Sequence, residues 1–302
     1  MPKLRFLVSL MTNDNDYQME QASSAEEAAQ KLGAEAKILY ADNDAITQST
    51  QILRAIQVPE KERPDAIVFE PVGSTALPQV ARAAVEAGIA WAVLNRNAPY
   101  IPELRRTSKV PIFGVSSDQV EVGRIAGQQC AALLPRGGSI LYIEGPSQDV
   151  VAKEREIGLR ESLPANIHFT SLRGQWTEES AQRSVRSWLS LSTSKKAIID
   201  LVLSQNDAMA IGARKAFQEI PNELERERWL AIPFLGCDGV PKTGQAWVRS
   251  GLLTATILTP PNTGKAMEML VDAMLNKKTL PERAFTVASS IPPLKSLAPP
   301  KL

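Results

Sequence analysis

The sequence predicts an α/β fold made of two doubly wound, Rossmann-like lobes, each built on a parallel sheet. Short runs rich in Val, Ile, Leu and Phe alternate along the chain with segments in which apolar residues recur at helical spacing. Such continuous apolar runs are typical of parallel strands buried on both faces. The chain has 302 residues, and single hydrophobic cores stop growing at roughly 250–300 residues, so we expect two lobes. Polar residues gather where the apolar runs end, which is where open α/β sheets bind ligands.

Ten runs have the length and composition of buried strands. They are residues 4–10, 36–41, 66–70, 90–95, 111–116, 139–144, 167–172, 200–205, 232–237 and 253–258. The clearest helical spacing lies at 19–33, 75–88, 119–134 and 178–191, and a further helical pattern begins directly after Asp207. Gly33 and Gly88 end two of these segments and supply the left-handed residue that closes many helices. Right-handed crossovers between the strands would then make each lobe a doubly wound sheet.

The composition argues against several classes of partner. There are 34 basic and 33 acidic residues without a basic block or an acidic tail, so neither nucleic acid nor an anionic membrane surface is expected as a partner. No run approaches the roughly 20 apolar residues of a membrane span, and the first ten residues are too polar for a secretory core. We expect a monomer that acts in the periplasm if a leader was removed, and otherwise in the cytoplasm.

The sequence has few residues or motifs that bind metals or cofactors. Cys130 and Cys237 fall in apolar patterns and are expected to be unpaired buried thiols, with a disulfide between them left open. The single histidine, His168, alternates as a strand residue and is expected to be structural. The chain has neither G-x-G-x-x-G after its first strand nor G-x-x-x-x-G-K-[ST], which argues against a nucleotide enzyme. We therefore expect no metal and no cofactor.

Polar groups follow nearly every predicted strand. They occur at 12–18, 42–44, 70–71, 95–97, 144–147, 173–176, 205–207 and 237–239. Helix capping is the simpler explanation for Asp42-Asn43-Asp44. It does not explain Glu70 before a proline, or Arg96, Gln205 and Trp176, so we expect ligand-binding crevices at these strand ends.

The side chains at the strand ends suit a polyol. They combine amides, carboxylates and cations in near charge balance with two flat aromatic faces. The polar candidates are Asn15, Gln18, Glu70, Asn95, Arg96, Lys153, Asn206 and Asp238, and the aromatic ones are Tyr17 and Trp176. Each sugar hydroxyl both donates and accepts, so carboxylates and a guanidinium can bind vicinal pairs of hydroxyls.

Several segments, in order and spacing, carry a resemblance to a known family. They are "LVSLMTNDNDYQ", "AIVFEPVGSTAL", "AWAVLNRNAP", "VVAKEREIGL", "SQNDAMAIGA", "LGCDGVPKTGQ" and "TATILTPPNTG". Together they resemble type I periplasmic sugar-binding proteins of the ribose-binding group, whose fold is shared by the ligand domains of lactose-repressor-like regulators. The similarity covers nearly the whole chain.

The resemblance implies ligand-binding roles in the first half of the chain. Asn15 lies where the family uses an amide, and Tyr17 and Gln18 occupy two positions that are aromatic in ribose binders. Asn95 and Arg96 match an Asp-Arg pair that binds ring hydroxyls. Glu70 replaces an amide of the family.

It also implies roles further along the chain. Lys153 falls where an arginine is usual, and Arg155 is the alternative cation. Trp176 matches an aromatic stacked on the sugar, whereas Asn206 and Asp238 match the family's amide and carboxylate ligands. Thr259 replaces a glutamine.

The departures from the family pattern favour a ligand other than ribose. Asn95 has one charge fewer than the family's Asp, Glu70 has one more than an amide, and Lys153 lacks the planar fork of arginine. An altered polyol, a hexose, an inositol and an amino sugar stay open. Structural roles also stay open: Arg96 as a solvated loop cation, Lys153 on a helix surface, Tyr17 in packing and Asp238 as a helix cap.

The family topology implies three crossings between the lobes. We expect an N-terminal lobe at 1–116 plus 260–288 and a C-terminal lobe at 117–259 plus 289–302. Thr259-Pro260-Pro261 suits a crossing, because consecutive prolines extend neither a helix nor a central strand. The ligand would lie between the lobes and close them by a hinge motion.

The resulting hypothesis is a non-enzymatic sugar or polyol receptor that delivers its ligand to an ABC-type permease. A cytosolic or signalling sensor, with a protein partner and without a DNA-binding domain, is the first alternative. A hydrolase that uses Glu70 and Asp238 as paired carboxylates is the second.

Overall fold

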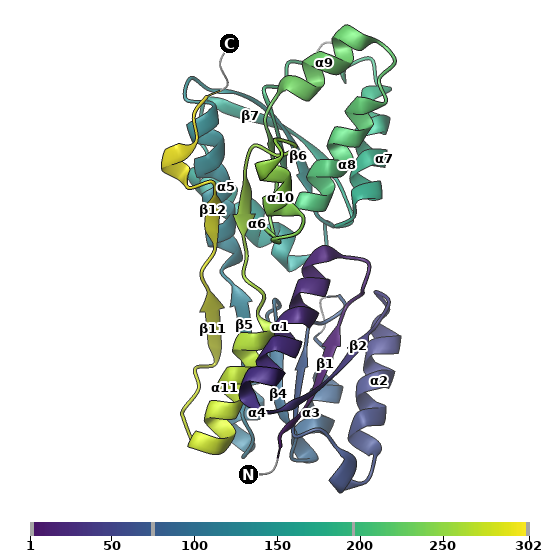
Figure 1. Ribbon diagram of the computed structural model, residues 1–302, viewed down its shortest axis with the longest axis vertical. Coiled ribbons are helices and arrows are strands. Elements are labelled where there is room, and N and C mark those ends of the chain that lie inside the picture. Colours follow the sequence, from purple (N-terminus) through teal and green to yellow (C-terminus); the bar gives the residue numbers. More distant parts are fainter. Residues whose placement is uncertain (1–2, 74–75, 195–196, 300–302) are drawn as a thin grey trace. The chain divides into compact units, whose positions relative to one another are not determined.

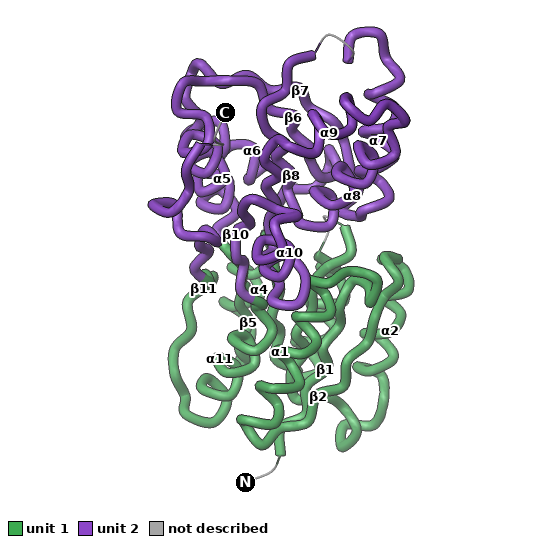
Figure 2. The backbone as a smooth tube through the Cα atoms, turned by 45° about the horizontal axis from the view of Figure 1, so that its top comes forward, with its two compact units in different colours: residues 1–117, 261–286 green, residues 118–260, 287–302 purple. Residues whose placement is uncertain are grey.

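The chain forms two compact units that are cut at three places. The computed structural model describes residues 3–73, 76–194 and 197–299 (Figure 1). Unit 1 comprises 1–117 and 261–286, and unit 2 comprises 118–260 and 287–302 (Figure 2). The second crossing falls between Pro260 and Pro261. Thr75, at the start of the helix expected over 75–88, and the chain ends at 1–2 and 300–302 lie outside the described residues.

Unit 1 is built on one parallel sheet with helices on both faces. In the described residues its six-stranded sheet has the order β11-β5-β4-β3-β1-β2, with every neighbouring pair parallel. The strands are β1 (Arg5–Leu10), β2 (Glu35–Tyr40), β3 (Ala66–Phe69), β4 (Ala90–Leu94), β5 (Ile112–Ser117) and β11 (Arg283–Thr286). The helices are α1 (Asp16–Leu32), α2 (Ala45–Gln57), α3 (Pro78–Glu86), α4 (Ile101–Thr107) and α11 (Thr263–Asn276), with a short 3₁₀ turn, η1, at Glu60–Glu62.

Alternation along the strands of unit 1 supplies two hydrophobic layers. Phe6 and Val8 of β1 face the layer that α1 and α11 cover, whereas Leu7 faces the layer under α2, α3 and α4. All three side chains are buried. This two-sided burial explains why the strands read as continuous apolar runs.

Unit 2 repeats the plan with a smaller sheet. Among its described residues a four-stranded parallel sheet has the order β7-β6-β8-β9. Its strands are β6 (Gly138–Glu144), β7 (Ile167–Arg173), β8 (Leu201–Ser204) and β9 (Phe234–Leu235), and a separate pair is formed by β10 (Thr256–Leu258) and β12 (Ser289–Ile291). The helices are α5 (Gln119–Leu133), α6 (Val150–Ser162), α7 (Glu178–Leu189), α8 (Asp207–Gln218), α9 (Glu223–Ala231) and α10 (Gly244–Arg249), with a 3₁₀ turn, η3, at Leu294–Ser296. Residues of β6 alternate between two hydrophobic layers, as those of β1 do.

The structure confirms the α/β class with parallel sheets and differs from the sequence prediction in detail. Each predicted strand is present, but 232–237 shortens to two residues of β9 and 253–258 to β10. The sequence prediction omitted β11 and β12, and β12 pairs antiparallel with β10. The prediction of unpaired buried thiols is confirmed, since Cys130 and Cys237 are both free and buried. Asp44 caps α2, as expected for the polar group at 42–44.

No helix within the described ranges combines the length and apolar character needed to cross a membrane.

Candidate functional site

In unit 1, the polar side chains at the carboxyl ends of β1 and β3 are joined. Gln18, in the first turn of α1, accepts a hydrogen bond from the backbone N–H of Met11 (3.0 Å) and donates to Glu70 Oε2 (2.9 Å). The Glu70 side chain is buried, with the residue only 4% exposed. Because β1 and β3 are neighbours in the sheet, the loop after one strand orients the carboxylate after the other.

Asn95 follows β4 in a left-handed conformation with φ 55°. Its Oδ1 accepts from Nδ2 of Asn262 (2.5 Å), and its Nδ2 lies 3.4 Å from the Tyr17 hydroxyl, to which it donates. The half-buried Arg96 donates from Nη1 to the Asn95 carbonyl (3.0 Å). The structure thus brings Tyr17, Asn95 and Arg96 together at the end of β4.

Asn15 has a structural task at the same edge of the sheet. It is the N-cap of α1, and its Oδ1 accepts from the backbone N–H groups of Tyr17 (2.9 Å) and Gln18 (3.2 Å). Capping satisfies donors that the first turn of a helix leaves free. The carbonyl end of Asn15 is therefore occupied, which leaves its amide N–H₂ as the end that could meet a ligand.

In unit 2, Arg155 is the centre of the candidate residues. It lies on α6, is 8% exposed, and donates from Nε to Gln119 Oε1 (2.9 Å) and from Nη1 to the Gln205 carbonyl. Its Nη2 is 3.8 Å from Asp238 Oδ1, and its guanidinium carbon is 5.7 Å from the Trp176 ring centroid. A guanidinium presents donors in a fixed plane, so one side chain can hold all these partners.

Trp176 follows β7 with a φ of 64°, again in the left-handed region. Its indole Nε1 donates to Asp149 Oδ2 (3.0 Å), and its carbonyl accepts from Nδ2 of Asn206 (2.9 Å). Asn206 also caps α8 by accepting from the Met209 N–H (2.9 Å). A Cβ at Gly145 would collide with the Trp176 ring, so glycine lets the ring lie over the end of β6.

Asp238 is held by its backbone beside β10, with a φ of 106°. Its N–H donates to the Ile257 carbonyl (2.9 Å), and its own carbonyl accepts from the Thr259 N–H (3.1 Å). Thr259 is buried, and its hydroxyl has no hydrogen-bond partner within the described part of the chain. An unsatisfied buried hydroxyl is costly unless something pairs with it.

A buried carboxylate, Asp207, fixes the loop that carries Asp238. Asp207 Oδ2 accepts from the Gly239 N–H (2.8 Å), and Oδ1 accepts from the Thr256 hydroxyl (2.6 Å). Burial raises the pKa of Asp207 well above its ordinary value, and the nearby negative charge of Asp238 raises it further.

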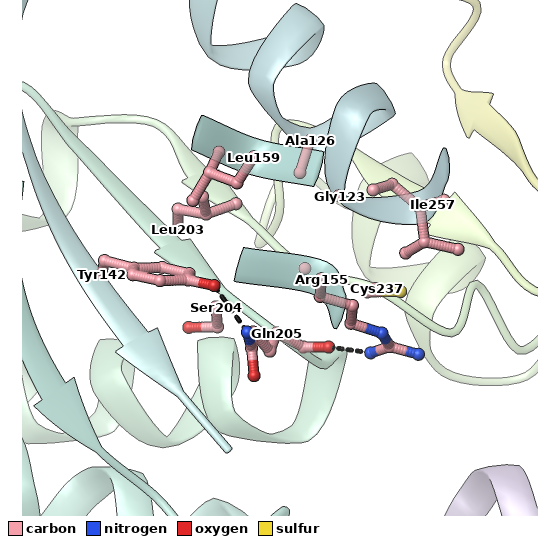
Figure 3. Close-up of a pocket in the computed structure, with 12 residues that line it drawn as sticks. Gly123, Ala126, Tyr142, Arg155, Leu159, Leu203, Ser204, Gln205, Cys237 and Ile257 are labelled. Atoms are coloured by element: carbon pink, nitrogen blue, oxygen red, sulfur yellow. Dashed lines mark hydrogen bonds between the residues drawn. The ribbon is translucent and has the colours of Figure 1, made fainter. Parts of the chain in front are cut away.

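A small pocket, partly open to solvent, lies in unit 2 beside Arg155. Figure 3 shows Gln205 between Tyr142 and Arg155, with its Nε2 donating to the Tyr142 hydroxyl and its carbonyl accepting from Arg155. The other lining is mostly apolar, from α5, α6 and β8. Gln205 therefore supports Arg155 from within unit 2.

Lys153 does not join this group. It is exposed on α6, and its ammonium group makes neither a hydrogen bond nor an ion pair in the described ranges. Residues two apart on a helix point about 200° away from each other, so Lys153 and Arg155 lie on different faces of α6. Of the two cations proposed for this position, the structure brings only Arg155 to Asp238 and Trp176.

The predicted ligand-binding residues also lack five side chains that support the candidate set. They are Asp149, Gln205, Asp207, Asn262 and Thr286. The sequence prediction places Gln205 and Asp207 in the polar group at 205–207 but assigns them no binding role, whereas Asn262 and Thr286 could be placed only with the sheet order known. Within the described residues, no cluster of three or more His, Cys, Asp or Glu side chains could hold a metal ion.

Two lobes with parallel sheets and polar strand ends define the class of bilobal α/β binding proteins. Residues 6–279 match the family described as periplasmic binding protein domain, and this chain belongs to that family. The resemblance found in the sequence is thereby confirmed.

Individual relatives support the same assignment. The chain is 28% identical over 219 residues to the D-ribose/D-allose-binding protein of Pseudomonas aeruginosa, a match that covers 71% of this chain and 66% of that protein. It is 25% identical over 262 residues to the ribose import binding protein of Salmonella typhimurium, covering 87% of this chain and 81% of that protein. Among solved structures, an ABC transporter periplasmic solute-binding protein from Actinobacillus succinogenes with bound D-allose has a TM-score of 0.81 at 21% identity, over 95% of this chain and 97% of that one. At this identity the structural similarity establishes the fold.

Proposed function

We propose that this protein binds a small sugar or polyol between its two units and serves as the periplasmic receptor of an ABC-type importer. Membership of the periplasmic binding protein family supports the role, and relatives named for ribose and allose support the ligand class. The protein would hand its ligand to a permease without changing it chemically.

The backbone at the strand ends is the observation that carries the proposal. Asn95 in unit 1 and Trp176 and Asp238 in unit 2 have φ values of 55°, 64° and 106°. Non-glycine residues in this region cost on the order of 1–3 kcal/mol each, and such strain clusters at ligand sites. All three follow strands of parallel sheets, where α/β folds bind ligands.

The charges favour a neutral ligand. Glu70 and Arg96 supply one charge of each sign in unit 1, and Asp238 and Arg155 do the same in unit 2. Carboxylates accept from hydroxyls, guanidinium groups donate to them, and the Trp176 ring offers a face for the C–H groups of a sugar. If the ligand pairs with both units, the closed form gains contacts that the open form lacks, and this difference drives closure.

A thermal-unfolding screen tests the proposal. The panel would contain D-ribose, D-allose, other hexoses, xylitol, myo-inositol and amino sugars. A ligand at 100 times its Kd that binds only the folded state adds about 2.7 kcal/mol to the free energy of unfolding. We expect a shift for at least one compound and none in Asp238→Ala, whose fold is checked by circular dichroism. Absence of any shift, or conversion of a bound sugar to product, would contradict the receptor role.

A further inference from the structure

A chain of hydrogen bonds crosses the interior of unit 1 and ends at Asn95. The Ser117 and Thr286 hydroxyls are 3.0 Å apart, and Thr286 Oγ1 donates to Asn262 Oδ1 (2.8 Å). Asn262 Nδ2 donates to Asn95 Oδ1 (2.5 Å), and Asn95 Nδ2 donates to the Tyr17 hydroxyl (3.4 Å). The members come from β5, β11, the start of α11, the end of β4 and α1, so the sheet order brings them together.

Asn262 is rigidly held within this chain. It is 0% exposed, so water does not compete for its amide. Its backbone N–H donates to Gln21 Oε1 (2.8 Å), which also accepts from the Thr263 N–H (3.0 Å). The two ends of a buried amide differ only in donating or accepting, so its neighbours decide its orientation.

We propose that Asn262 is a positioning residue that fixes which end of the Asn95 amide meets the ligand. The Asn262 N–H₂ occupies Asn95 Oδ1 in the interior. Asn95 Nδ2 then has one N–H directed at Tyr17 and a second without a partner among the described residues. The proposal rests on the sugar-binding function, and adds that position 95 donates to a ligand oxygen acting as an acceptor.

The N–H group of Asn95 would prefer a ligand atom that accepts a hydrogen bond, a preference that an aspartate at position 95 would not give. A carboxylate accepts only, so it requires a ligand hydroxyl that donates. The donor presented by Asn95 tolerates a ligand atom without a hydrogen, such as a ring oxygen, a carbonyl oxygen or fluorine.

Monodeoxy and monofluoro analogues of whichever of D-ribose, D-allose, xylitol and myo-inositol binds best provide the test. For each hydroxyl of the ligand, the Kd of the deoxy analogue is compared with the Kd of the parent compound. At the hydroxyl that Asn95 contacts, the deoxy analogue should bind more weakly than the parent to wild type, but no more weakly than the parent to Asn95→Ala. At that position we expect the monofluoro analogue to bind wild type within about threefold of the parent compound. Isothermal titration calorimetry measures both Kd values.

The informative variant is Asn262→Asp, which is isosteric and accepts only. Its carboxylate would accept from Thr286 and from Asn95 Nδ2, so the Asn95 amide would turn and present its carbonyl oxygen. The parent hydroxyl can reverse and donate, whereas fluorine cannot. We therefore expect the fluoro-to-parent Kd ratio to rise by about tenfold or more in Asn262→Asp. Thr286→Val is the second variant, for use if Asn262→Asp does not fold. It removes the hydrogen bond that Thr286 donates to Asn262 without burying a charge, and it should also raise the fluoro-to-parent Kd ratio.

Each other outcome has a definite meaning. The fluoro-to-parent Kd ratio could instead be high already in wild type and unchanged in the variants. This would show that the hydrogen bonds run in the opposite direction and that Asn95 presents its carbonyl oxygen, which would overturn the proposal. Equal loss for parent and fluoro compounds would show that Asn262 is only structural. Ser116→Ala is the control, because it removes a buried hydroxyl whose one hydrogen bond within the described residues goes to the Ser117 carbonyl (2.7 Å), and it should leave the ratio unchanged. If wild type binds no compound of the panel, the result contradicts the proposed sugar-binding function and does not bear on the orientation of the Asn95 amide.

Discussion

At the scale of single residues, Arg155 holds the candidate residues of unit 2 together. Its planar group meets Gln119, the Gln205 carbonyl and Asp238, while its face lies over Trp176. A lysine offers one ammonium on a flexible stem and cannot reach these partners simultaneously. The buried arginine therefore orients both the carboxylate and the aromatic ring.

We expect Arg155→Lys to lower the free energy of unfolding by about 1–3 kcal/mol, because buried acceptors lose their donors. Sugar binding should weaken by at least about tenfold, which the loss of one charge-assisted hydrogen bond would produce. Lys153→Ala is the matched control and should change neither quantity, since Lys153 is exposed on another face of α6. Urea denaturation and calorimetry measure the two effects. A larger effect of Lys153→Ala on binding would reverse the assignment of the cation.

Gly145 is the second residue with a sharp expected effect. An added Cβ would occupy the place of the Trp176 ring, so Gly145→Ala should move the ring and weaken sugar binding by about tenfold, as the loss of an aromatic contact of about 1 kcal/mol or more would. Gly114→Ala is the control, because its Cβ would find its nearest neighbour, the Val93 carbonyl, at 3.7 Å. Tryptophan fluorescence together with titration separates ring displacement from unfolding. An unchanged affinity in Gly145→Ala would remove Trp176 from the site.

At the scale of elements, the N-terminus of α8 and the loop after β9 form one unit through Asp207. Burial raises the pKa of this carboxyl in the folded state, so the folded protein binds a proton more tightly than the unfolded chain. Stability contributed by the protonated form is then lost as the pH rises from the unfolded value of about 3.9 through the folded pKa. Both oxygens accept hydrogen bonds, from Gly239 and Thr256, which softens this loss.

We expect Asp207→Asn, which imitates the neutral acid, to flatten the pH dependence of stability. From about pH 4 upward, wild type should lose stability relative to the variant by at most about 1.4 kcal/mol per pH unit. Urea denaturation of both proteins from pH 4 to pH 8 measures the difference. If the free energy of unfolding of wild type instead rises relative to that of the variant as the pH rises, the surroundings stabilise the Asp207 carboxylate and do not destabilise it.

The sequence predicted the elements better than the contacts between them. Strands buried on both faces leave a continuous apolar run, and Asp44 and Gly33 mark helix ends by local rules. The antiparallel pairing of β12 with β10 depends on where the chain returns after the third crossing, which no local pattern records. Asn262 illustrates the same limit for the site: it lies 167 positions from Asn95 and meets it only through the sheet order.

At the scale of the whole molecule, the three crossings give the proposed hinge. The chain passes between the units after residues 117, 260 and 286. Within unit 1, Ser117, Asn262 and Thr286 lie beside these crossings and are linked to one another by hydrogen bonds. The hydrogen-bond chain that ends at Asn95 therefore begins where the proposed hinge begins, so the proposed hinge motion and the proposed ligand contact at the end of β4 would involve one set of side chains.

Ligand-driven closure can be measured by fluorescence transfer between the units. Lys109→Cys in unit 1 and Glu227→Cys in unit 2 place exposed thiols for labelling. The native thiols would stay unlabelled, because burial raises the pKa of Cys130 and Cys237, the latter to about 12. We expect a sugar that stabilises the protein to change the transfer efficiency, since contacts to both units favour the closed form. The same pair of labels in Asp238→Ala should show no change. Tight binding with constant efficiency in the otherwise native protein would place the ligand within one unit, and closure would then have no driving force.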